Sequence, residues 1–205
     1  MLNKNNIIQI LESIGKSISS ETTIYLIGGC AMSLKGLKPE TIDMDMVLLT
    51  EKSYSDIKTA LLKLGYEVTS KTQYAETVYK NAFVLFKKGD SKIDIFVMRV
   101  CNLFDFSTAM MNRARLFGRY DKLNVRLASD EDIFLFKSIT GREKDLDDLA
   151  ILNGSITEWH LIINEFNNQK VRNLVIEEFL GTIKRLGELG ITVPINSKLL
   201  ELKKR

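Results

Sequence analysis

A glycine pair between two strand-like runs most constrains the fold of this chain. The run Thr22–Ile27 is rich in β-branched and aromatic residues and ends at Gly28 and Gly29. A short helical stretch follows, and Met44–Leu49 has the character of a second, largely apolar strand. The order predicts a strand, a tight glycine turn, a helix and a second strand.

Two acids mark the start of the second strand. Asp43 and Asp45 are two residues apart, so on a strand they project from the same face. Like charges side by side among apolar residues are costly unless a cation lies between them. Mg²⁺ meets this need, because it prefers one or two carboxylates together with substrate phosphates. The pair therefore indicates metal-dependent phosphoryl or nucleotidyl transfer.

The hydrophobic period changes at Ser129. Before it, strand-like and helical runs alternate, and after it every run has helical spacing. Ser129 followed by Asp132 is typical of a helix N-cap. We therefore predict an α+β domain over residues 1–128 and a helical domain over residues 129–205. The expected strands are 22–27, 44–49, 66–70, 82–87, 92–97, 114–117 and 123–127, and the expected helices are 7–18, 31–37, 53–64, 106–111, 131–140, 143–153, 158–167 and 171–189.

The composition limits the expected cellular compartment and partners, but not the reaction. The chain has 205 residues and a formal net charge of +3, which permits a nucleic-acid partner without requiring one. Its two cysteines, Cys30 and Cys101, are too few for a disulfide framework or a four-ligand zinc site. The first residues lack the apolar run of a signal peptide, and no run reaches membrane-spanning length. We expect a cytoplasmic protein with no membrane partner.

The glycine pair, the acid pair and a third acid together resemble a known superfamily. Asp94 is the only acid in the apolar run 92–97, where it supplies a third carboxylate on a later strand. This pattern is similar to that of the nucleotidyltransferase superfamily, which includes polymerase β, the aminoglycoside nucleotidyltransferases and the minimal enzymes of toxin–antitoxin loci. The resemblance implies a nucleotidyltransferase-fold mixed β-sheet with flanking helices, followed by a helical C-terminal region.

Further likeness points to the AbiEii-like branch of that superfamily, which includes nucleotidyltransferase toxins. The local sequence motif lies in residues 29–31, 36 and 41–45. The resemblance extends over roughly residues 20–155. Lys137, Arg142, Asp145 and Asp148 are similar to the branch's helical segment of one lysine, one arginine and two acids. Cys30 is a departure, since many members have serine there.

The resemblance also implies roles for the acids and glycines. Asp43, Asp45 and Asp94 would be the catalytic residues and would hold Mg²⁺, with two ions expected. Asp94 could instead accept the proton of the acceptor hydroxyl. Gly28 and Gly29 would let the backbone approach the triphosphate of an NTP substrate, with the N–H groups of the following helix aimed at it.

In the helical domain the implied role is nucleotide binding. Lys137 and Arg142 would neutralise triphosphate charge. Asp145 and Asp148 would orient these two cations, or contact the base or the ribose. An ordinary solvated helix face is the alternative for all four residues.

The predicted function is Mg²⁺-dependent transfer of NMP from an NTP to an acceptor hydroxyl, with tRNA as the acceptor and an antitoxin protein as a partner if the AbiEii-like likeness holds. Two alternatives stay open: a small-molecule, aminoglycoside-type nucleotidyltransferase, and a non-catalytic module that binds a nucleotide or RNA. A basic series could grip RNA phosphates, or could protect an edge strand by charge. Its members are Arg113, Arg115, Arg119, Lys122 and Arg126.

Overall fold

The computed structural model describes residues 1–69, 83–169 and 173–195. The chain divides into two compact units, Met1–Ala128 and Ser129–Arg205, and each is described here by itself. The ends of two predicted strands, at residue 70 and at residue 82, lie outside the described residues. Among the described residues, no helix is both long and apolar enough to cross a membrane.

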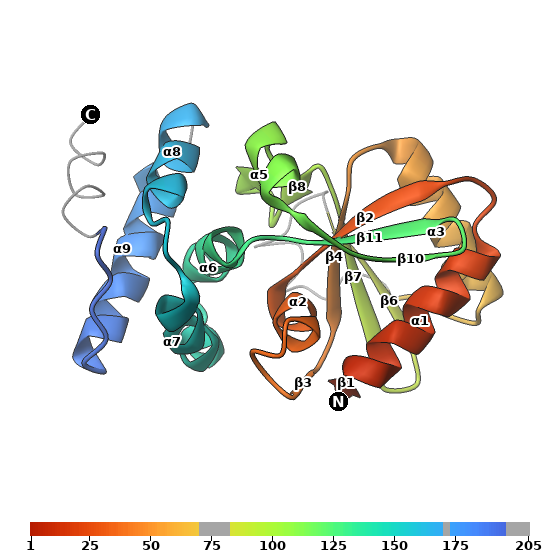
Figure 1. The fold of residues 1–205 in the computed structure, drawn as a ribbon, viewed down its shortest axis with the longest axis horizontal. Coiled ribbons are helices and arrows are strands. Elements are labelled where there is room, and N and C mark those ends of the chain that lie inside the picture. Colours follow the sequence, from red (N-terminus) through yellow and green to blue (C-terminus); the bar gives the residue numbers. More distant parts are fainter. Residues whose placement is uncertain (70–82, 170–172, 196–205) are drawn as a thin grey trace. The chain divides into compact units, whose positions relative to one another are not determined.

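A mixed β-sheet organises the first unit (Figure 1). In the described part, its strands are, in spatial order, β10 (Arg115–Tyr120), β11 (Leu123–Leu127), β2 (Thr22–Ile27), β4 (Met44–Leu48), β7 (Ser91–Val97), β6 (Phe83–Lys88) and β5 (Glu67–Val68). The pairs β11–β2 and β4–β7 are parallel, and the other neighbours are antiparallel. Strand β4, which carries Asp45, therefore lies inside the sheet rather than at an edge.

Two short strand pairs flank this sheet. Strand β1 (Leu2–Asn3) pairs with β3 (Glu40–Thr41), and β8 (Arg99–Val100) pairs with β9 (Phe104–Asp105). The first pair joins the beginning of the chain to the segment just before Asp43, with Leu2 opposite Thr41. The sequence analysis did not predict either pair, because strands of two residues carry no usable periodicity.

Helices cover one face of the sheet in the first unit. They are α1 (Lys4–Ser17), α2 (Gly28–Leu34) and α3 (Glu51–Lys63). A further helix of this unit, α5 (Thr108–Arg113), follows β9. The α1 N-terminus is closed by a reciprocal capping box between Asn3 and Asn6. A Cβ on Gly15 of α1 would lie 3.3 Å from Cβ of Leu123, which faces the same side as Val125 and Leu127 of β11. Helix α1 therefore packs on that face.

The second unit is helical. Its described elements are α6 (Asp130–Ser138), the 3₁₀ turn η1 (Glu143–Asp145), α7 (Leu146–Ser155), α8 (His160–Asn168) and α9 (Asn173–Glu188). The Ser129 cap is confirmed, because Asp132 N donates to Ser129 Oγ at 3.2 Å. Its core is aromatic: Phe179 lies with ring centroids 6.1 Å from Phe134 and 5.3 Å from Phe166, both edge-on.

Several predicted boundaries shift. Helix α2 begins at Gly28 and not at residue 31, and the predicted helix 143–153 begins as the 3₁₀ turn η1. The predicted strand 114–117 is β10, which starts at Arg115. Arg113 ends a helix that Ser107 caps, whereas Arg115 begins β10, so these two members of the basic series do not share a strand. The α+β class with a mixed sheet and a helical C-terminal region is confirmed.

Candidate active site

The sheet register brings the glycine turn and two of the acids together. Ile27, the last residue of β2, is the partner of Asp45 on β4. Asp45 is in turn the partner of Asp94 on the parallel strand β7. Paired residues of neighbouring strands project to the same side, about 5 Å apart. Ile27, Asp45 and Asp94 therefore lie in one row across three strands, and Gly28 directly follows Ile27.

The row faces away from the helices that cover the sheet. Residues on either side of the two acids point to the helix-covered face and are fully buried; they are Met44, Met46, Ile93 and Ile95. Strand alternation then places Asp45 and Asp94 on the opposite face, where both are half-buried. One row further from the turn, Tyr25 is buried against Phe106, with ring centroids 5.0 Å apart. On the sheet face that carries Asp45 and Asp94, Tyr25 is therefore buried, whereas the two acids are partly exposed.

Close packing explains why glycine occupies position 28. Gly28 has φ +62°, in the region that disfavours other residues, and a Cβ there would collide with the carboxylate of Asp45. The backbone of the turn therefore touches the acid on the neighbouring strand.

Gly29 is constrained from another side. A Cβ on Gly29 would collide with Oγ1 of Thr41, and it would lie 3.8 Å from Nζ of Lys38. Thr41 and Lys38 were not among the predicted site residues. Nothing in their spacing from the glycines signals this contact, since it depends on how the segment 35–40 returns along α2.

Cys30 lies directly behind the acid pair. Its Sγ is 3.1 Å from the carbonyl oxygen of Ile27 and 3.5 Å from that of Asp45. Burial raises the pKa of the Cys30 thiol, and the negative charges of Asp45 and Asp43 raise it further. The side chain at this departure from the family pattern points into the protein and ties the two strands of the site, as a neutral thiol.

Asp43 completes the predicted trio from the segment before β4. It is half-buried and two residues before Asp45, and its charge reaches Cys30 as that of Asp45 does. Among the described residues, no three His, Cys, Asp or Glu side chains are arranged as a ready metal site. Mg²⁺ does not need such a cage, since it is usually held by one or two carboxylates, water and substrate phosphates. The in-register, half-buried carboxylates of Asp45 and Asp94, with half-buried Gly28 beside them, fit that ligand set.

The four predicted nucleotide-binding residues of the second unit form an ion network. Nζ of Lys137 lies 2.7 Å from Asp145 Oδ1 and 2.8 Å from Asp148 Oδ2. Nε of Arg142 lies 2.6 Å from Asp145 Oδ2. Burial alone would lower the pKa of Lys137, but the two carboxylates outweigh it and raise that pKa above its ordinary value.

Exposure differs sharply within this network. The side chain of Lys137 is 7% exposed and that of Asp145 is 5% exposed, whereas that of Arg142 is 39% exposed. Of the two cations, Arg142 is therefore the one that a solvent-borne phosphate can reach without opening the helices of this unit.

The basic series does not form one continuous patch. Lys122 Nζ donates to the carbonyl of Ile18 at 3.3 Å, and Arg126 Nε donates to that of Ala114 at 3.2 Å. Arg119 lies 3.4 Å from Glu21 in an exposed pair. The strand register nevertheless makes Arg126 of β11 the partner of Tyr25 on β2. Arg119 of β10 is the partner of Asn124, which is two residues before Arg126 and projects from the same face of β11. These two arginines share the sheet face of Asp45.

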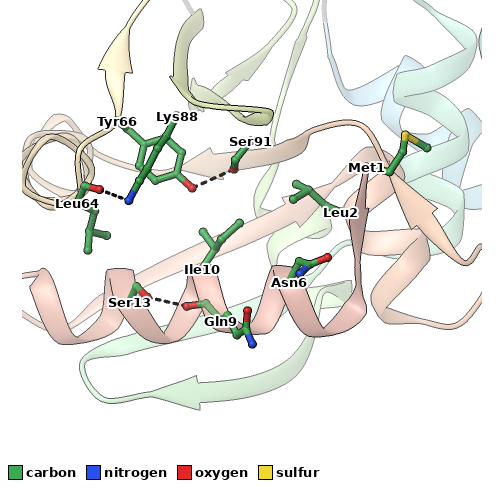
Figure 2. Close-up of a pocket in the computed structure, with 10 residues that line it drawn as sticks. All are labelled: Met1, Leu2, Asn6, Gln9, Ile10, Ser13, Leu64, Tyr66, Lys88 and Ser91. Carbon is green, nitrogen blue, oxygen red and sulfur yellow. Dashed lines mark hydrogen bonds between the residues drawn. The ribbon is translucent and has the colours of Figure 1, made fainter.

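A separate pocket of about 410 Å³ lies between α1 and the β6–β7 hairpin (Figure 2). None of the predicted site residues lines it. Its polar groups bond to one another: Tyr66 Oη and Ser91 Oγ are 3.0 Å apart, and Lys88 Nζ donates to the carbonyl of Leu64 at 2.7 Å. The pocket is therefore separate from the acid row.

Comparisons with known proteins agree with this fold. No protein-family model matches the chain, and a search of curated proteins finds no match. The solution structure of the antibiotic-resistance factor ANT(2'')-Ia matches with a TM-score of 0.52 at 13% identity, covering 92% of this chain and 97% of that one. The first unit, with its acid row on a mixed sheet, has the nucleotidyltransferase fold.

Two further solved structures are more distant. A proposed nucleotidyltransferase of Thermotoga maritima has a TM-score of 0.49 at 13% identity, over 76% of this chain and 97% of that one. A crystal structure of ANT(2'')-Ia with adenylyl-2''-tobramycin has a TM-score of 0.43 at 14% identity, over 97% and 93%.

Proposed function

We propose that this protein is an Mg²⁺-dependent nucleotidyltransferase that transfers NMP from an NTP to an acceptor hydroxyl. The observation that carries the proposal is that Asp45 and Asp94 are half-buried partners on one face of a nucleotidyltransferase-fold sheet, with Gly28 packed against the Asp45 carboxylate. A module that only binds an anion gains nothing from two carboxylates placed side by side, since they would repel the ligand. Their placement supports metal-assisted chemistry.

The residues divide the work of an in-line displacement. The backbone of half-buried Gly28 packs against Asp45 and would contact the triphosphate beside the acids. The acceptor oxygen attacks the α-phosphorus, its bond to the bridging oxygen of the β-phosphate breaks, and pyrophosphate leaves. Asp94 would receive the acceptor's proton, directly or through water. Bound Mg²⁺, held by Asp43, Asp45 and Asp94, would neutralise charge on the phosphates and lower the pKa of the hydroxyl.

In the second unit, the proposed phosphate contact is Arg142. Lys137, Asp145 and Asp148 then act by fixing its position, because they are buried and already paired with one another. The four predicted nucleotide-binding residues therefore have two different roles. The more exposed guanidinium contacts the ligand, and the three buried groups orient that guanidinium.

An RNA hydroxyl is the proposed acceptor, with tRNA as the predicted example. Arg119 and Arg126 share the sheet face of the acids. Cations on that face suit a polyanionic acceptor. The toxin role and the antitoxin partner rest on the AbiEii-like sequence resemblance.

A small-molecule acceptor is the second candidate. The fold match to ANT(2'')-Ia extends over nearly the full length of both chains, and that protein is an antibiotic-resistance factor. The arginines on the sheet face of Asp45 and Asp94 would repel a polycationic antibiotic. A small-molecule acceptor of this kind would therefore have to approach the acids from a side without these arginines.

The deciding experiment follows label from each of four α-³²P-NTPs, with Mg²⁺ or with EDTA, to total tRNA and to an aminoglycoside panel. Transfer to RNA that requires Mg²⁺ is the expected result. Asp45→Asn and Asp94→Asn should each lower transfer about 100-fold or more, since each loss removes several kcal/mol of charge stabilisation.

The matched control is Asp90→Asn, which changes an exposed acid in the turn between β6 and β7. It should leave transfer unchanged. Label on the aminoglycosides alone would favour the second candidate. Transfer that persists in EDTA, or in both acid variants, would refute the proposed mechanism.

A further inference from the structure

We propose that Lys92 and Lys87 bind the β- and γ-phosphates of the NTP and the pyrophosphate that leaves. The proposal rests on the proposed nucleotidyltransferase function and adds to it the direction in which the triphosphate lies on the sheet. Its basis is that both lysines project from the sheet face of Asp94, in the row next to the acids.

The strand register places the two lysines on this face. Lys92 precedes Asp94 by two residues on β7, so the two side chains project to the same side, roughly 7 Å apart along the strand. Lys87 of β6 is the strand partner of Lys92 and therefore projects to that side as well. The adjoining Lys88 projects to the opposite side, where it lines the pocket beside α1 (Figure 2).

The rows on either side of the acids differ in burial. Toward the C-terminal ends of β4 and β7, the next row on this face consists of the buried side chains of Tyr25, Val47 and Phe96. Toward the N-terminal ends, the next row holds Lys92, which is half-buried, and Lys87, which is exposed. A triphosphate whose α-phosphate lies at Asp45 and Asp94 therefore extends toward the lysines.

Acidic residues lie near both lysines without pairing with them in the described part of the chain. Asp94 shares the face of Lys92, and Glu67 of β5 is the strand partner of Lys87. Within residues 1–69, 83–169 and 173–195, however, neither lysine takes part in an ion pair. An anionic ligand can therefore bind either ammonium without first displacing a carboxylate from it.

The charge of the leaving group explains why cations are needed here. When the bond between the α-phosphorus and the bridging oxygen breaks, its electron pair stays on pyrophosphate, whose negative charge increases. The carboxylates of Asp45 and Asp94 repel that charge. An ammonium in the next row stabilises it, and half-buried Lys92 contributes more than exposed Lys87, because water and salt screen a buried charge less.

The test measures by calorimetry the binding of Mg²⁺–pyrophosphate, Mg²⁺–tripolyphosphate and the Mg²⁺ complexes of the four NTPs, without an acceptor. Lys92→Met should raise each dissociation constant about tenfold, which corresponds to the loss of one charge-assisted hydrogen bond. Lys87→Met should raise it about threefold, as expected for an exposed cation. Lys92→Arg keeps the charge and should stay within about threefold of the wild type.

Lys88→Met is the matched control. It removes the same charge from the same strand, but from the opposite face of the sheet. It should leave the binding of all these ligands unchanged. An equal loss of affinity in Lys88→Met and Lys92→Met would show that only the net charge matters, and would overturn the assignment of the lysines.

Two results distinguish failure of this proposal from failure of the proposed function. If the wild type binds these ligands and Lys92→Met binds them equally well, the lysine assignment is wrong and the proposed function stands. If the wild type binds none of them, both are overturned. Circular dichroism verifies the fold of each variant, and Lys92→Gln takes the place of Lys92→Met if the latter does not fold.

Discussion

At the scale of single residues, the candidate site is defined by contacts of the backbone as much as by its acids. Gly28 is required because the Asp45 carboxylate fills the space of its missing side chain, and Gly29 because Thr41 does the same. The glycines and acids of the sequence pattern are thus two halves of one packing arrangement.

Gly28→Ala should therefore disturb Asp45 directly. The added methyl group collides with the carboxylate, and φ +62° strains any residue other than glycine. We expect transfer to fall about 100-fold, with a drop of about 1–3 kcal/mol in the free energy of unfolding, measured by label transfer and by denaturant titration. Gly154→Ala, on a helix with open space around the glycine, should keep full activity. An unimpaired Gly28→Ala enzyme would disprove the packing argument.

Cys30 offers a second test at this scale. Its thiol is buried, and its pKa is raised by that burial and by the charges of Asp45 and Asp43. A neutral, enclosed thiol is a poor nucleophile, so a thiol reagent at pH 8 should label it only as fast as the first unit opens. The measurement is the labelling rate with and without mild denaturant. Rapid labelling of Cys30 in the folded protein would show that the thiol is exposed or ionised.

At the scale of elements, local hydrogen bonding joins segments that the sequence pattern treats separately. The turn between α1 and β2 is bound to α3 through Asp56, whose carboxylate accepts from the backbone and hydroxyl groups of Ser19 and Ser20. Partial burial raises the pKa of Asp56, but these hydrogen bonds outweigh it and lower the pKa from 3.8 to about 2.

This lowered pKa predicts that the free energy of unfolding decreases at acidic pH. Because the folded-state pKa is lowered, the stabilisation is present above the ordinary pKa and is lost as the pH falls from about 4 toward 2. Asp56→Asn should lose that part of the pH dependence and be less stable than the wild type at pH 7. Urea unfolding at pH 7, 4 and 2.5 measures both effects. An unchanged slope between pH 4 and 2.5 would contradict the linkage.

The ion network between α6 and α7 makes a different prediction. Lys137→Met leaves Asp145 and Asp148 with uncompensated buried charge, which should cost about 3–5 kcal/mol in the free energy of unfolding. Arg142→Met removes a 39% exposed cation and should cost much less, while weakening NTP binding. Chemical denaturation and calorimetry of both variants test the split. Equal destabilisation by the two variants would argue against it.

The same network has a predictable response to alkali. The pKa of Lys137 is raised, so its stabilisation is fully present below the ordinary lysine value of 10.5 and is lost only as the pH rises through the higher folded-state value. Buffers between pH 6 and 9 should therefore leave this contribution unchanged.

At the scale of the whole molecule, the balance of charge separates the two acceptor candidates. The net charge is only +3, yet arginines 119 and 126 lie on the sheet face of the acids. Transfer to RNA should fall steeply between 50 and 200 mM salt, because each phosphate contact releases counterions. Arg119→Gln should flatten the dependence of RNA affinity on salt, measured by filter binding. If Arg119→Gln leaves a steep salt dependence unchanged, this face of the sheet does not contact the RNA.

The sequence alone determined the fold class and the chemistry expected of it. Strand alternation fixed which side of β4 carries Asp45, and β2 and β11 were located to the residue. The Ser129 cap was equally readable, because a hydroxyl that accepts from the third residue on is a local interaction. Such features depend on neighbours a few positions away, which a sequence displays directly.

Only the tertiary structure decided how distant segments meet. The register that sets Asp94 beside Asp45, the return of Lys38 and Thr41 to Gly29, and the burial of Lys137 all join residues remote in sequence. No periodicity encodes a register between strands or the exposure of one lysine over another. These follow from packing of the whole unit, in which each contact depends on all the others.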